Sequence, residues 1–96
     1  MAEPRATVVT IPDRNGLPNE VEIYLNPEAR DQLIRELQGL NEKSDHVHYG
    51  TWEGAEVSLQ DIAYSPRQVI VDHLKIYFRL DAWDQQYFPH VIPSKK

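Results

Sequence analysis

The sequence of 96 residues contains no cysteine, and this absence removes several kinds of chemistry. Without cysteine, the chain can form no disulfide framework, thiolate nucleophile or zinc–sulfur site. It also lacks any apolar run near the ~20 residues that cross a bilayer, and its N-terminal region carries no signal-peptide core. We therefore expect one small cytoplasmic domain that makes no membrane contact.

Glycine and basic residues are also scarce. Each of the four glycines, Gly16, Gly39, Gly50 and Gly54, fits a turn or a cap, so no phosphate-binding loop is present. No Ser/His/Asp order, H-E-x-x-H motif or paired carboxylate at catalytic spacing accompanies them. Ten Lys and Arg against fifteen Asp and Glu give a net charge of −5, which disfavours a phosphate backbone as ligand. We expect no enzyme, no cofactor and no nucleic-acid partner.

One stretch, residues 69–80, organises the chain. Its second part alternates strictly, which predicts a strand with one buried face and one wet face. The buried face holds Leu74, Ile76, Phe78 and Leu80, and the wet face holds His73, Lys75, Tyr77 and Arg79. The apolar run 69–71 predicts that the first third is covered on both sides. Its length and its β-branched residues predict a central strand rather than an edge strand.

The N-terminal part predicts a hairpin followed by a helix. Residues 6–11 and 20–25 are the two strands, and Asn15-Gly16 suits the turn between them. We expect the second strand to turn Val21, Ile23 and Leu25 to the core, and Glu22 and Tyr24 outward. Asn26 and Pro27 match the cap and first position of a helix whose apolar face holds Ala29, Leu33, Ile34 and Leu37. Gly39 fits a left-handed C-terminal cap, and Asp31 and Arg35 can pair one turn apart.

The C-terminal half predicts further strands and a short helix. Residues 46–51 and 56–62 are strands around a turn at 52–55, with Val57 and Leu59 facing inward. Asp81 can cap a short helix in which Trp83 packs on the core with Tyr87 and Phe88. The expected fold is α+β: a mainly antiparallel sheet of about five strands (β-β-α-β-β-β) with one principal helix on one face and a short C-terminal helical turn. It forms one domain, residues 1–96, with loose ends at 1–5 and 91–96.

Candidate binding residues gather on the outer sheet face and in one loop. Tyr and Arg are enriched at protein interfaces, and loop tryptophans beside carboxylates suit a basic protein site. The candidates are Tyr24, His46, His48, Trp52, Glu53, Glu56, His73, Lys75, Tyr77 and Arg79. Imidazoles two residues apart can also converge on a metal ion, with His73 completing a set. We favour the plainer interpretation, in which the histidines are half-exposed polar residues of an open sheet.

Three segments, in this order, resemble one known family. They are Tyr24-Leu25-Asn26-Pro27-Glu28, then Asp45-His46-Val47-His48 followed by Trp52, and last His73-Leu74-Lys75-Ile76-Tyr77-Phe78-Arg79. Over residues 21–83 the chain resembles the immunity protein 32 family of bacterial polymorphic toxin systems. The resemblance implies a small cytosolic α+β protein that neutralises a cognate toxin. Residues 6–11 and those after Asp84 lie outside the resemblance.

The resemblance implies a stoichiometric inhibitor as the function. A toxin that acts on nucleic acid needs a basic groove, which an acidic partner can occlude while aromatic anchors slow its release. An alternative is a small α+β homodimer with a regulatory or structural role, pairing through its open sheet face. A metal-binding or enzymatic module is a third interpretation, and nucleic-acid binding ranks last.

Overall fold

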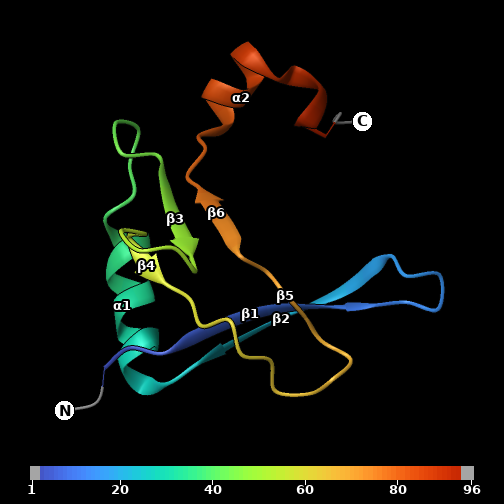
Figure 1. Cartoon of the computed structure of the whole chain (residues 1–96). Coiled ribbons are helices and arrows are strands. Elements are labelled where there is room, and N and C mark those ends of the chain that lie inside the picture. The colour runs from blue at the N-terminus through green and yellow to red at the C-terminus, as the bar shows by residue number, and fades with distance from the viewer. Residues whose placement is uncertain (1–2, 94–96) are drawn as a thin grey trace.

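The computed structural model describes residues 3–93 and has the predicted α+β fold, with one principal helix and a short helical segment near the C-terminus (Figure 1). The elements are β1 (Ala6–Pro12), β2 (Pro18–Leu25), α1 (Pro27–Gln38), β3 (His46–Gly50), β4 (Val57–Ser58), β5 (Val69–Ile70), β6 (His73–Tyr77), α2 (Asp81–Tyr87) and the 3₁₀ turn η1 (Pro89–Val91). No helix in the described part is long and apolar enough to cross a membrane.

The strands are divided between two small sheets rather than joined in one. The strand order is β2-β1-β5 in the first sheet and β4-β3-β6 in the second. All pairs are antiparallel except β3–β4, which is parallel and joins Tyr49 to Val57. The predicted strand 56–62 is therefore only a short β4, although Val57 and Leu59 are buried as expected.

The prediction of one long central strand over residues 69–80 is wrong. The segment forms two separate strands, and neither is central. The chain leaves the first sheet at Val71, whose N–H bonds to Val8 of β1, and joins the second at Asp72, whose carbonyl accepts from Thr51. The two pieces, β5 and β6, are both edge strands. Val69, expected to be covered on both sides, is exposed because β5 lies at an open edge.

The core lies where the two sheets and α1 meet. It consists of Ala6, Val8, Ala29, Val47, Tyr49, Val57 and Leu59, with Leu33, Leu40, Val71, Leu74 and Ile76 packed around it. Burial raises the pKa of the Tyr49 phenol, and no described residue hydrogen-bonds its hydroxyl. The inward alternation predicted for residues 74–80 is confirmed at Leu74 and Ile76. It is wrong at Leu80, which lies beyond the end of β6 and is 38% exposed.

The burial predicted for β2 is wrong. Val21, Ile23 and Leu25 are 60%, 50% and 36% exposed, because the core that buries Ala6 and Val8 of β1 includes no residue of β2. The opposite face is the better covered one. There Tyr24 stacks on Tyr64, and residues 60–70 run beneath the hairpin.

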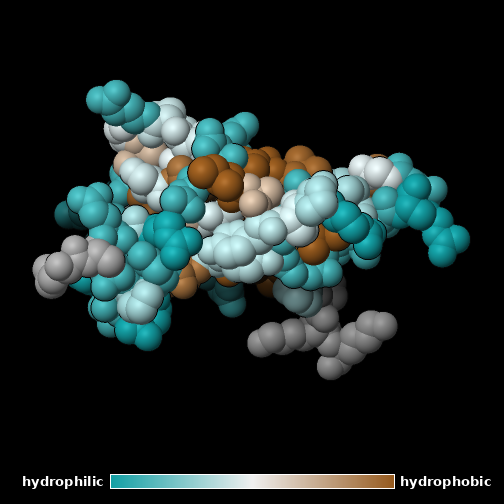
Figure 2. All heavy atoms as spheres, turned by 60° about the horizontal axis from the view of Figure 1, so that its bottom comes forward, coloured by the Kyte–Doolittle hydropathy of each residue, from teal (hydrophilic) through white to brown (hydrophobic). Residues whose placement is uncertain are grey.

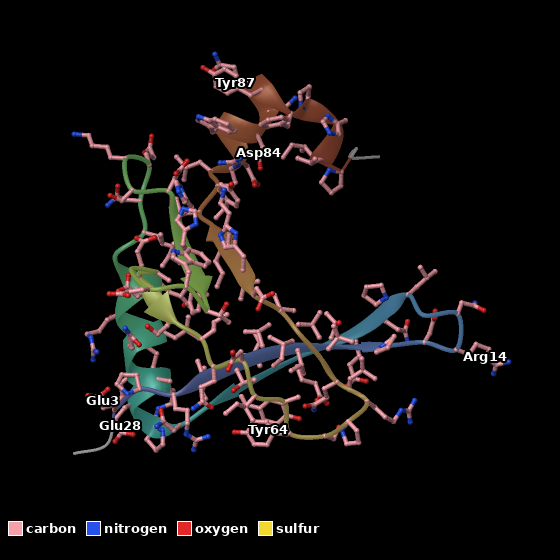
Figure 3. The ribbon with its side chains drawn as sticks, in the orientation of Figure 1. Glu3, Arg14, Glu28, Tyr64, Asp84 and Tyr87 are labelled. Atoms are coloured by element: carbon pink, nitrogen blue, oxygen red, sulfur yellow. The ribbon has the colours of Figure 1, made fainter. Side chains whose placement is uncertain are left out.

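The start of α1 follows the sequence closely. The Asn26 side chain accepts from the Ala29 N–H at 2.9 Å, and Pro27 takes the first helical position. Asn26 also accepts from the Arg5 N–H and donates to the Glu3 carbonyl, each at 2.9 Å, so residues 3–5 are anchored rather than loose. Glu3 and Glu28 accordingly lie together beside this helix end (Figure 3).

The end of α1 departs from the prediction in two respects. Gly39 has a φ of −81° and not the left-handed value expected, so the helix closes in an ordinary right-handed turn. Asp31 pairs with its neighbour Arg30 at 3.1 Å instead of Arg35. Further along the chain Asp81 does not cap α2, because Leu80 takes that position without a side-chain hydrogen bond.

Two parts of the chain project from the body. A compact chain of this length has a radius of gyration of about 12–13 Å, whereas this one has 16.1 Å. One projection is the β1–β2 hairpin, which ends near Arg14, and the other is the α2–η1 segment, which holds Tyr87 (Figure 3). Residues 91–93 belong to this second projection, whereas 1–2 and 94–96 lie outside the described residues.

Asn26→Ala should lower the free energy of unfolding by about 1–2 kcal/mol, since it removes the cap of α1 and the anchor of residues 3–5. Asn26→Asp keeps the accepting oxygen and should recover most of that loss. Urea unfolding of the three proteins measures both differences. Equal destabilisation by the two substitutions would contradict the capping role.

Candidate functional site

The candidate site is the face of the β3–β6 pair that points away from α1. The register places His46 opposite Tyr77, His48 opposite Lys75, and Gly50 opposite His73. Val47, Leu74 and Ile76 turn to the core on the other side. The predicted wet face therefore exists, and we call it the histidine face: His46, His48, Gly50, Trp52, His73, Lys75 and Tyr77.

Aromatic and imidazole rings form a continuous line across this face. Tyr77 lies 5.4 Å from His46, and His46 lies 4.9 Å from His48, measured between ring centroids. His48 then stacks on His73 at 5.2 Å, and the Trp52 ring meets His73 edge-on at 4.7 Å. Five rings from two segments of the sequence, residues 46–52 and 73–77, thus form one surface stripe.

The two central histidines share a hydrogen bond. The Nδ1 of His48 lies 3.0 Å from the Nε2 of His73, so one of these nitrogens donates while the other accepts. This bond joins a side chain of β3 to one of β6 on the exposed face. Within residues 3–93 no three His, Asp or Glu side chains converge in a way that could hold a metal ion.

Trp52 lies on the sheet because of a glycine that sequence reasoning had assigned only to a turn. The indole covers Gly50, and a Cβ at that position would overlap with the ring. Trp52 is nevertheless 42% exposed, since it packs on the face from outside. Because Gly50 has no side chain, the large exposed indole can pack directly on the backbone there. An exposed aromatic residue fixed in this way is expected of an interface anchor.

Arg79 was predicted to contact a partner, but its side chain contacts other residues of this chain. Its guanidinium lies 4.9 Å from the centre of the Tyr77 ring and 4.3 Å from that of Trp83. It also pairs with Asp84 at 3.3 Å and with Asp45 at 3.5 Å. Arg79 is thus the link that holds α2 to the end of β6, and Asp84 lies at the base of α2 in Figure 3.

The prediction that Trp83 packs on the core is wrong. Trp83 does contact Tyr87 and Phe88, with ring centroids 4.6 and 5.7 Å away. This cluster is 39–55% exposed, and it packs on Arg79 instead of the core. The α2–η1 segment therefore borders the histidine face at its Tyr77 end.

Carboxylates around the face are largely engaged. His46 Nδ1 lies 2.8 Å from an Asp45 oxygen, and this hydrogen bond, together with the charge of Arg79, lowers the pKa of the Asp45 carboxyl. The side chain of Glu56, the residue before β4, accepts a hydrogen bond from the His48 backbone N–H at 2.9 Å. Glu53 is exposed at the loop tip beside Trp52.

Tyr24 does not belong to the site, contrary to the prediction. It lies on β2 in the other sheet, stacked at 4.0 Å on Tyr64 from the segment beneath the hairpin. Its hydroxyl donates to Glu22 at 2.7 Å, which raises the pKa of the phenol, and it accepts from Gln68. Tyr24 therefore fastens residues 64–68 to β2.

The arrangement of rings is suited to packing against the surface of another molecule. Ring faces and edges, with Lys75 above Tyr77 at 5.0 Å, offer stacking and cation–π contacts to another surface. Sequence reasoning found most of these residues from the alternation of β6 and the His46/His48 spacing. It missed Gly50 and Asp45, whose contributions depend on the approach of Trp52 and Arg79 in space.

Gly50→Ala should displace Trp52 from the sheet, because the added methyl group occupies the place of the indole. We expect a red-shifted tryptophan emission and a loss of about 1–3 kcal/mol in stability. Gly39→Ala is the matched control, since its Cβ would meet only ordinary contacts at 3.5 Å and its φ suits alanine. An unchanged spectrum for Gly50→Ala would contradict the described position of Trp52.

Comparisons with family models, with curated proteins and with solved structures found no match to this chain.

Proposed function

We propose that this protein is an immunity protein that binds and occludes a cognate toxin through the histidine face. The support is the family resemblance, together with the position of the segments that carry it. Two of the three segments, residues 45–52 and 73–79, form the β3–β6 pair. The resemblance therefore falls on the surface whose composition suits protein contact.

One observation carries the proposal: five aromatic or imidazole rings are held side by side on an exposed sheet face. Forming such a stripe exposes Trp52 and Tyr77 to water at a cost that burial against a partner would recover. Each ring is already fixed by a neighbour, so little side-chain entropy is lost on binding. Rigid aromatic residues of this kind supply most of the affinity in many interfaces.

The electrostatic part of the mechanism needs revision. The expectation was an acidic surface that enters a basic toxin groove. On this face, however, Asp45 and Glu56 are engaged by the chain itself, and Lys75 contributes positive charge. Glu53 remains as the carboxylate beside Trp52, and the net charge of −5 acts over a longer range. We infer that charge speeds the encounter, whereas aromatic contacts hold the complex.

Trp52→Ala should weaken toxin binding at least about tenfold, because it removes the largest exposed ring of the face. Glu53→Lys should mainly slow association, and more so at low salt. The measurements are protection of cells that express the toxin encoded beside this gene, and surface plasmon resonance with the same toxin made catalytically inactive.

Leu17→Ala provides the control, because Leu17 is an exposed apolar residue in the β1–β2 turn, away from the face. It should leave protection unchanged. Full protection by the Trp52→Ala/Glu53→Lys double variant, with normal folding, would contradict the proposed surface. If the neighbouring genes encode no toxin, the proposed function itself fails.

A further inference from the structure

Strand β2 is an open edge of the first sheet, and its backbone groups can be assigned a direction. The Asn26 N–H donates to the Arg5 carbonyl, one step beyond the pairing of Ala6 with Leu25. Because antiparallel bonds alternate, Glu22 and Tyr24 turn their backbone groups toward β1. Val21, Ile23 and Leu25 therefore turn their N–H and C=O groups outward, away from the sheet.

The other side of β1 agrees with this assignment. The carbonyls of Ala6 and Val8 accept from Gln60 and Val71, which lie on the side away from β2. These two residues pair with Leu25 and Ile23 respectively, so all four belong to the pairs that are not hydrogen-bonded between β1 and β2.

The residues with outward backbone groups also carry the exposed apolar side chains. Val21, Ile23 and Leu25 share the side of the sheet on which Ala6 and Val8 are buried, but lie beyond the edge of the core. Hydrophobic residues gather in the middle of the molecule in Figure 2, between its hydrophilic ends. Natural edge strands are usually protected by lysine, proline or a bulge. In β2 the proline and the bulge lie at Pro18 and Asn19, before the exposed apolar residues begin, because Ile11 pairs with Glu20 and Pro12 with Pro18. The charged residues Glu20 and Glu22 lie on the opposite face of the strand, so residues 21–25 carry no lysine, proline or bulge of their own.

We propose that β2 pairs antiparallel with β2 of a second copy, about a two-fold axis through Ile23. The axis places Ile23 opposite itself and Val21 opposite Leu25 of the second copy. All three pairs then exchange backbone hydrogen bonds, and the apolar side chains of the two copies meet on one face. The two first sheets join into one continuous sheet with the order β5-β1-β2-β2-β1-β5.

The polar residues of β2 select this register and this occupant. With the axis at Ile23, Glu22 faces Tyr24 of the second copy, and Glu20 faces Asn26. With the axis one position earlier, two Glu22 carboxylates would face each other, which is destabilising. An axis between residues would pair opposite faces of the pleat and is excluded. An axis at Tyr24 would place Val21 opposite Pro27, where α1 begins, and leave it without a strand partner. The axis at Ile23 avoids like-charge pairs and uses all three residues with outward backbone groups.

The proposed dimer leaves the histidine face open. Strand β2 belongs to the first sheet and the histidine face to the second, so one copy can pair through β2 and bind another partner through β3–β6. The dimer therefore goes beyond the proposed function and does not depend on it. It also differs from a dimer formed through the open sheet face.

Sedimentation velocity of the full chain measures the proposed association directly. We expect a dimer at about 100 µM that dissociates on dilution toward 1 µM, as for interfaces of modest area. Ile23→Lys places two charges at the axis and should give a monomer at every concentration. Ile62→Lys, the same substitution at a site 69% exposed, should leave the dimer intact. A wild-type monomer throughout, or equal effects of the two variants, would overturn the proposal.

Single-cysteine variants test the register, because the chain has no cysteine of its own. Two copies of residue 23 would have Cα atoms about 5.5 Å apart, within the range of a disulfide. Two copies of residue 21 would be about 14 Å apart, beyond that range.

Mild oxidation should therefore convert Ile23→Cys to a covalent dimer and leave Val21→Cys mainly monomeric. The two positions share a strand, a face and similar exposure, which makes them a matched pair. Equal cross-linking of both variants, or cross-linking at residue 21 alone, would overturn the proposed pairing.

Discussion

The packing of one face of the β3–β6 pair against the core determines the rest of this structure. Val47, Leu74 and Ile76 can be buried only if their neighbours in sequence point to the opposite side. Those neighbours are the histidines, Lys75 and Tyr77. Helix α1 packs on the buried side, with Val47, Leu74 and Ile76. The exposed stripe of rings is thus a direct consequence of strand alternation and of where the apolar residues lie.

The stripe is more ordered than alternation alone requires. Register places His48 and His73 diagonally across the two strands, within hydrogen-bond distance, and Gly50 leaves room for Trp52 to lie flat. At the other end Arg79 joins Tyr77 to the α2–η1 segment through stacked rings and two carboxylates. A surface fixed in this way is suited to contact with a folded partner, because few groups need to reorganise.

Local signals predicted local structure well. The Asn26-Pro27 cap, the Gly16 turn, with its φ of 80°, and the alternation of β6 each depend on residues close in sequence. Three local predictions failed, at Gly39, Asp31 and Asp81, but the larger errors concern contacts between distant segments. The apolar run from Val69 to Val71 gives no sign that the chain changes sheets at Asp72. The exposure of Ile23 depends on how far α1 extends over the hairpin. Neither can be obtained from spacing alone.

The same limits apply to the site. Tyr24 and His46 were both predicted to point outward from a strand, on one sheet face. They lie on different sheets. The roles of Asp45, Gly50 and Glu56 became visible only when their partners were placed in space. The two surfaces proposed here, one for a toxin and one for a second copy, lie on different sheets and are independent in their tests.

The central claim is that the histidine face is where a protein partner binds. Amide hydrogen exchange of the chain, free and in complex with its cognate toxin, tests this claim most directly. The account predicts new protection confined to residues 46–53 and 73–79, with β2 and α1 unchanged by the toxin. Protection elsewhere, with these two segments exchanging as in the free protein, would contradict it.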